Sequence, residues 1–172
     1  MFVHIALAFA AVHAAANPDS VARATASKRL TFAAADSVVV EKKKHQLTLF
    51  AAGAPVRTYS VALGNPVGDK QRQGDRRTPE GVYRIDSRNP QSKYHLSLHI
   101  SYPDAAHAAR AKAKGVTPGG DIMIHGLAPE FAAAGPLHRT HDWTEGCIAL
   151  TNDEIEEIWS AVRDGTPIHI MP

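Results

Sequence analysis

The chain has 172 residues, which suits one domain after a short leader. Hydrophobic residues make up 44% and charged residues 21%, so a core can form and disorder is not the default expectation. The net charge of +2 is small and scattered, which argues against a nucleic-acid partner. The longest basic run, at 42–44, is predicted to be a solvated turn between two strands.

Residues 1–16 form an apolar stretch that ends in three alanines, like the end of a signal peptide. The usual positive start is absent, because no Lys or Arg precedes Arg23. The stretch is too short to span a bilayer comfortably, and no later segment is long and apolar enough. We therefore expect an exported protein, periplasmic or in the cell envelope, without stable membrane insertion. Residues 17–36 are predicted to be a linker, and 37–172 one folded domain.

Short β-type segments dominate the folded part, with alternating or continuously apolar runs. They predict strands at 38–40, 46–50, 56–63, 82–85, 95–101, 121–125, 148–150 and 168–171. The first three are predicted to form a meander. The expected fold class is therefore mainly β.

Two or three short helices are predicted between these strands. One covers 103–114, which is rich in alanine and has a proline in its first turn. A capping-box pattern at 151–154 starts another, whose apolar face includes Trp159 as a core residue. A helical turn is expected near 129–134. The long segments 64–81 and 126–146 are predicted to be loops, and long loops in compact domains tend to be functional.

The single cysteine, Cys147, excludes an internal disulfide framework. His125 ends a strand, and its imidazole could take the thiol proton if that strand lies beside the short strand after Cys147. Gly146 could let the backbone approach a substrate and offer an N–H group to an oxyanion. A buried, inert cysteine is the alternative that these residues leave open.

Several separated segments resemble the L,D-transpeptidase catalytic domain, the YkuD-type family. They are LGNPVG at 63–68, GDRRTPEG at 74–81, MIHG at 123–126 and DWTEGCIALTNDEI at 142–155, within a likeness from about 38 to 170. The resemblance implies a β-sandwich-like catalytic domain over 37–172. It also implies that Cys147 is the nucleophile, that His125 is the general base and acid, and that the Gly126 carbonyl orients His125.

In that family the thiolate attacks a peptide carbonyl in a peptidoglycan stem, beside a D-amino acid. A thioester acyl-enzyme forms, and an amine or water resolves it. The resemblance implies peptidoglycan stem peptides as partners and no metal or organic cofactor. We expect a monomer that cross-links or remodels the cell wall.

Two positions depart from the family pattern, because Glu145 stands where many members have His and Ala149 where they have Arg. The missing arginine would be a natural partner for a substrate carboxylate. Arg139 is a candidate replacement, as is the pair at 76–77. Further candidate substrate contacts lie in the second loop: Trp143, which could instead pack beneath that loop, and Thr144.

Other roles for neighbouring residues stay open. His138 and His141 could join the Cys–His pair as zinc ligands, but the spacing matches no compact zinc pattern. Asp121 or Asp142 could orient the catalytic imidazole, although capping of backbone groups is the favoured interpretation for both. Tyr94, His95 and His99 are predicted to lie on a strand, whose alternate members His95, Ser97 and His99 share a face toward the cleft or solvent.

Three further functions compete with transpeptidation. The same thioester resolved by water would give a carboxypeptidase or an amidase. A non-catalytic wall-binding module would keep the cleft without using the thiol. A papain-like protease is disfavoured, since that arrangement places Cys before His in the chain.

Overall fold

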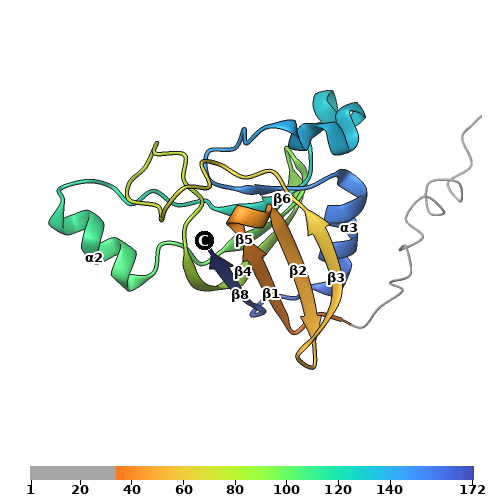
Figure 1. Ribbon diagram of the computed structural model, residues 1–172, viewed down its shortest axis with the longest axis horizontal. Coiled ribbons are helices and arrows are strands. Elements are labelled where there is room, and N and C mark those ends of the chain that lie inside the picture. Colours follow the sequence, from red (N-terminus) through yellow and green to blue (C-terminus); the bar gives the residue numbers. More distant parts are fainter. Residues whose placement is uncertain (1–33) are drawn as a thin grey trace, which may run out of the picture.

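A computed structural model describes residues 34–172 (Figure 1). The predicted leader and all of the predicted linker except 34–36 lie outside the described residues, so the structure does not test them. Within the described range, no helix is both long and apolar enough to cross a membrane.

One curled sheet of eight strands forms the body of the domain, in the order β3-β2-β1-β8-β4-β5-β6-β7 (Figure 1). The strands are β1 Ser37–Glu41, β2 Gln46–Ala51, β3 Ala54–Ser60, β4 Gly81–Ser92, β5 His95–Ile100, β6 Met123–His125, β7 Ile148–Ala149 and β8 Pro167–Met171. The first three form the predicted antiparallel meander. The last strand, β8, then lies between β1, to which it is parallel, and β4, to which it is antiparallel. The mainly β fold class is confirmed.

The helices are few and short. They are the α-helices α2 Ala105–Ala113 and α3 Asn152–Ala161, with 3-10 segments η1 Lys42–Lys44 and η2 Pro129–Thr140. In Figure 1, α2 projects from the side of the body opposite α3. The segment predicted near 129–134 is longer than expected, and its two halves meet at Gly135, whose φ of 49° is not helical.

The helix α3 closes the core on one face of the sheet. The predicted capping box starts it, with the Thr151 hydroxyl accepting from the Glu154 N–H and the Glu154 carboxylate accepting from the Thr151 N–H. Ile155 and Ile158 are fully buried in the main core cluster. Trp159 packs at the edge of that cluster, partly buried.

Several predicted strands have different bounds in the structure, and the one predicted at 56–63 is β3, which ends at Ser60. β4 extends to Ser92, well beyond the predicted end at Ile85, because its outer half pairs with β5. The sequence did not predict this half, since it is largely exposed and carries no apolar alternation. The segment predicted as 121–125 pairs only from Met123, because Asp121 has a φ of 54° and breaks the strand conformation. The break at Asp121 lies beside Cys147.

The basic run at 42–44 is a turn, but Lys42 is not solvated as predicted. Its side chain is fully buried, and the ammonium donates to the carbonyl oxygens of Gly68 and Thr78 at 2.7 and 3.0 Å. It also forms an ion pair of 2.8 Å with Glu80. A buried charge needs such partners, because desolvation without them is costly. Lys42 therefore attaches the long loop 64–80 to the first hairpin.

Candidate active site

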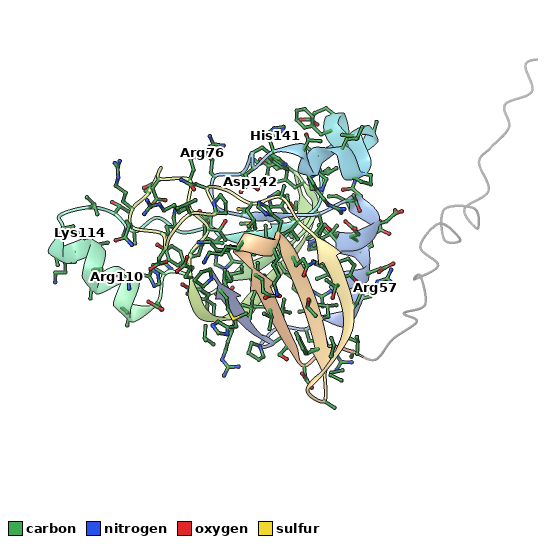
Figure 2. The ribbon with its side chains drawn as sticks, viewed as in Figure 1. Arg57, Arg76, Arg110, Lys114, His141 and Asp142 are labelled. Carbon is green, nitrogen blue, oxygen red and sulfur yellow. The ribbon has the colours of Figure 1, made fainter. Side chains whose placement is uncertain are left out.

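The loop 64–80 and the loop that precedes Cys147 meet over the sheet. A Cβ atom added to Gly64 would lie 2.0 Å from the Arg76 carbonyl oxygen and 2.7 Å from the Gly146 nitrogen. Gly146 itself has a φ of 124°, and a Cβ there would lie 2.7 Å from the Arg77 carbonyl oxygen. Figure 2 shows Arg76 and Asp142, one from each loop, in the same region. Only glycine allows these two backbones to pack so closely.

The strands β6 and β7 bring His125 and Cys147 to one face of the sheet. They are parallel neighbours, with Ile124 opposite Ile148 and His125 opposite Ala149. Because side chains alternate along a strand, Cys147 lies on the face that His125 shares with Ala149. Cys147 directly precedes β7, one residue before the paired register begins. The predicted side-by-side arrangement of the two strands is confirmed.

The thiol of Cys147 is partly buried between backbone groups of the segment before β6. Its sulfur lies 3.5 Å from the Asp121 carbonyl oxygen, to which the S–H donates. Burial raises the pKa of Cys147 above its ordinary value of 9.0, and the Asp121 carboxylate adds to this. The Met123 N–H and the Lys70 ammonium lower it, without reversing the direction. In the resting state Cys147 is therefore a neutral thiol, which needs a base to remove its proton before it can act as a nucleophile.

His125 is arranged as such a base. Its ring is 3% exposed, and Nδ1 lies 2.7 Å from the Gly126 carbonyl oxygen. A carbonyl only accepts, so Nδ1 carries the proton and Nε2 is left free to accept one. Burial lowers the pKa of His125 below 6.5, and nearby Lys93 adds to this against the hydrogen bond to Gly126. The imidazole is therefore neutral at neutral pH.

Sequence comparison with known proteins assigns the family. The family model of the L,D-transpeptidase catalytic domain matches residues 35–170. The chain belongs to the L,D-transpeptidase family. It is 33% identical over 98 residues to the Escherichia coli K12 protein named "Putative L,D-transpeptidase YafK", in an alignment that covers 56% of this chain and 32% of that protein.

Solved structures of this family share the fold. The helical cell shape determining protein Pgp2 of Campylobacter jejuni matches with a TM-score of 0.60 at 23% identity, over 88% of this chain and 54% of that one. L,D-transpeptidase 3 of Mycobacterium tuberculosis, solved with a faropenem-derived adduct, matches with a TM-score of 0.54 at 17% identity, over 81% and 61%. The chain thus spans about a third of the curated relative and about half of the Pgp2 chain.

Aromatic rings surround His125 in this L,D-transpeptidase domain. Tyr94 stacks on the imidazole with ring centroids 4.5 Å apart, and Trp143 meets it edge-on at 5.9 Å. Trp143 also lines an apolar cavity of about 350 Å³ together with His138 and Phe131 of η2. Its indole nitrogen is buried and has no hydrogen-bond partner among the described residues. Trp143 therefore packs beneath the loop and lines a cavity at once.

Gly146 and Thr144 form hydrogen bonds within the protein that the sequence does not predict. The Gly146 N–H, predicted to face an oxyanion, donates instead to the Thr144 hydroxyl at 3.2 Å. Thr144, predicted to contact substrate, is 3% exposed, and its hydroxyl donates to the Cys147 carbonyl oxygen at 2.7 Å. Both groups are paired inside the protein, and their roles toward substrate stay predictions. The two residues hold the turn that presents Cys147.

The arginines proposed to replace the missing family arginine are engaged elsewhere. Arg139 forms an ion pair with Glu154 at the start of α3 and is largely buried. Arg77 donates to the Asp69 carbonyl oxygen at 3.2 Å within its own loop. Arg76 forms an exposed ion pair of 3.2 Å with Glu145, the residue at the family's histidine position. Only Arg76 therefore stands at the surface beside the cysteine turn.

Asp142 and Asp121, the candidate partners for orienting His125, form other contacts. Asp142 accepts from the Leu63 N–H at 2.8 Å and contacts His45 Nε2 at 2.9 Å, so it caps backbone as favoured. The Asp121 side chain is 91% exposed and faces His99. Residues 34–172 contain no group of three or more His, Cys, Asp or Glu side chains that could hold a metal ion.

Three parts of the site were missed or misplaced by sequence reasoning. Tyr94 lies in the turn between β4 and β5 rather than on a strand, which lets its ring reach His125. The Asp121 carbonyl and the Met123 N–H contact the thiol through backbone atoms, which leave no signal in residue types. His95, with a φ of 72°, turns away from Ser97 and His99 and pairs with Glu156 of α3.

The lowered pKa of His125 predicts the pH dependence of acylation. The rate requires neutral imidazole, so kcat/KM should rise with pH through the pKa of His125 and level off above it. We expect this acid limb to have its midpoint below pH 6.5, because burial holds the pKa below that value. The measurement is kcat/KM from pH 4 to 10.

A second buried histidine supplies the control for that profile. Burial lowers the pKa of His138 to about 4, so it titrates in the same acidic range. His138→Asn should keep the acid limb, whereas His125→Asn should remove it along with most activity. A limb centred above pH 6.5, or one that survives in His125→Asn, would contradict the assignment.

Proposed function

We propose that this domain is a cysteine-dependent L,D-transpeptidase that acts on peptidoglycan stem peptides through a thioester. The observation that carries the proposal is the His125 tautomer. Its Nδ1 is fixed on the Gly126 carbonyl, which leaves Nε2 free, and the strand of His125 pairs with β7, which directly follows Cys147. A neutral base beside a neutral thiol suits proton transfer during attack.

The reaction has two steps. In the first, Nε2 of His125 takes the thiol proton as sulfur attacks the peptide carbonyl. The C–N bond then breaks, His125 returns the proton to the leaving amine, and a thioester remains on Cys147. In the second, an acceptor amine attacks the thioester carbonyl, an amide bond forms, and the C–S bond breaks. The amine loses a proton to His125, which passes it to the departing sulfur.

The names of relatives support the same class of substrate. The curated relative carries an L,D-transpeptidase name, and Pgp2 of Campylobacter jejuni is named a helical cell shape determining protein. A role in cross-linking or remodelling the wall, in the periplasm or elsewhere in the cell envelope, is the corresponding proposal for this chain. Hydrolysis by water would use the same thioester and is the alternative outcome.

Product analysis tests the proposal. The purified chain is incubated with a disaccharide-tetrapeptide, and the products are separated by liquid chromatography and identified by mass. Cross-linked dimer that disappears in Cys147→Ala is the expected result. Trimmed monomer alone would reassign the domain to hydrolysis. If neither product forms with tetrapeptide or with other wall fragments while sacculi are still bound, the domain would be a wall-binding module.

A further inference from the structure

The segment η2, at the top of the view in Figure 1, encloses an apolar cavity of about 350 Å³ together with the residues on either side of it. The lining contains no Asp, Glu, Lys or Arg and consists of Leu127, Ala128, Phe131, Ala134, Leu137, His138, His141 and Trp143. Sites for small ligands have volumes in this range, and most of them are apolar with a few polar groups. The cavity therefore has the size and the lining of a site for a small apolar group.

Two polar side chains in this lining have no hydrogen-bond partner within residues 34–172. His138 is 7% exposed, and neither of its ring nitrogens forms a hydrogen bond in that range. The indole Nε1 of Trp143 is buried and is also unpaired there. The two rings meet edge-on with their centroids 6.4 Å apart, so they form one corner of the cavity. Buried polar atoms normally have a partner, and these three nitrogens are therefore available to a ligand that enters the cavity.

The cavity favours an uncharged ligand. Burial lowers the pKa of His138 to about 4, and the Arg139 cation adds to this against the Glu154 carboxylate. The His138 imidazole is therefore neutral at neutral pH, with one nitrogen that donates and one that accepts. A charged group would lose its hydration in this apolar lining, which is costly without an opposite charge.

A hydroxyl group on an aromatic ring matches the polar atoms and the shape of the lining. The Trp143 N–H only donates, whereas neutral His138 can also accept. A hydroxyl oxygen can accept from Trp143 while its O–H donates to His138, and neither a carbonyl nor a hydrocarbon can do both. An aromatic ring suits the apolar walls, because pairs of rings gain stability beyond the area that they bury and both Phe131 and Trp143 line the cavity.

We propose that the cavity under η2 binds a neutral phenol-type group, with Trp143 as the donor to its hydroxyl oxygen and His138 as the acceptor of its hydroxyl proton. This site is separate from the reacting atoms, since neither Cys147 nor His125 belongs to its lining. It is adjacent to them, because the Trp143 ring also meets His125 edge-on. The inference goes beyond the proposed function and does not depend on it.

Titration of the whole chain with p-cresol, followed by NMR, tests the site without any turnover. The indole N–H signal of Trp143 should move downfield to saturation, whereas that of Trp159, which lies outside the lining, should not move. Ala134→Leu fills the cavity and should abolish the shift. The same substitution at Ala109, on the exposed surface of α2, is the matched control and should leave the shift unchanged. Benzoate and benzylammonium, which are charged, should not bind.

The source of the phenol group is distinguished by a tripeptide with tyrosine between two leucines. Phe131 and Leu137 are 61% and 72% exposed although both line the cavity, so residues beside a bound tyrosine could cover them. Tighter binding of the tripeptide than of p-cresol, lost when Phe131 and Leu137 are both replaced by Ser, would support the site with a peptide tyrosine as its ligand. Equal binding would support it with a free phenol.

His138→Phe separates recognition of the hydroxyl from burial of the ring. The variant should fold, because it removes two buried nitrogens that lack a partner among residues 34–172. Its affinity for p-cresol should fall about five-fold relative to its affinity for toluene, as for the loss of one hydrogen bond. An equal change for the two probes would overturn the proposal, as would a Trp143 signal that p-cresol does not move in the unchanged chain.

Discussion

Cys147→Ser is expected to lower turnover by roughly 10³-fold or more, which is the loss seen when a nucleophile that works as a unit with its base is replaced. A serine hydroxyl has a far higher pKa than a thiol, and the neutral imidazole of His125 is too weak a base to compensate. The measurement is kcat/KM for release of the terminal D-amino acid.

The matched variants exclude a folding artefact. The thiol makes only weak contacts with backbone groups, with the Met123 N–H and, at 3.5 Å, with the Asp121 carbonyl, so neither Cys147→Ser nor Cys147→Ala should lower the free energy of unfolding by more than about 1 kcal/mol. Both should keep the near-ultraviolet circular dichroism of the unchanged chain. Substantial turnover in either folded variant would exclude the thioester route.

Gly64→Ala is expected to have the largest structural effect of any single methyl added near the site. The new Cβ would lie 2.0 Å from the Arg76 carbonyl oxygen and 2.7 Å from the Gly146 nitrogen. Neither atom can move freely, because the Arg76 carbonyl accepts from the Asn65 N–H at 2.6 Å and the Gly146 N–H donates to Thr144. We expect a loss of about 3 kcal/mol or more in the free energy of unfolding.

The activity of Gly64→Ala should fall together with its stability, because the strain acts on the turn that presents Cys147. Gly53→Ala is the control, since nothing lies within 4 Å of the added Cβ and the site is in the turn between β2 and β3. It should cost about 1 kcal/mol from its positive φ and leave kcat unchanged. Equal stability of the two variants in urea denaturation would contradict the close packing of the two loops.

The sequence was sufficient for most of the fold, where local pattern and burial agree. The meander and α3 follow from alternation and from a capping box, both of which are local signals. The burial of Lys42 could not be predicted, because its partners Gly68, Thr78 and Glu80 come from a distant loop. The outer half of β4 was missed since it is held by pairing with β5 and not by an apolar face.

The candidate site also has parts that the sequence predicts and parts that depend on contacts the sequence does not reveal. Residue types and resemblance together predict the Cys147–His125 pair, and resemblance alone predicts the Gly126 carbonyl that contacts His125. Gly146 and Thr144 form hydrogen bonds across a turn, which residue type alone does not predict. The position of Arg139 was equally hidden, because its partner Glu154 was visible only as a helix cap.

The proposed reaction depends above all on Cys147 carrying an acyl group between its two steps. Intact-protein mass spectrometry of the chain incubated with disaccharide-tetrapeptide detects that group directly, with a parallel sample treated first with iodoacetamide. We expect an adduct equal to the substrate without its terminal D-amino acid, localised to Cys147 and absent after alkylation or in Cys147→Ala. Turnover by the chain after complete alkylation of Cys147, or an adduct on another residue, would contradict the thioester route.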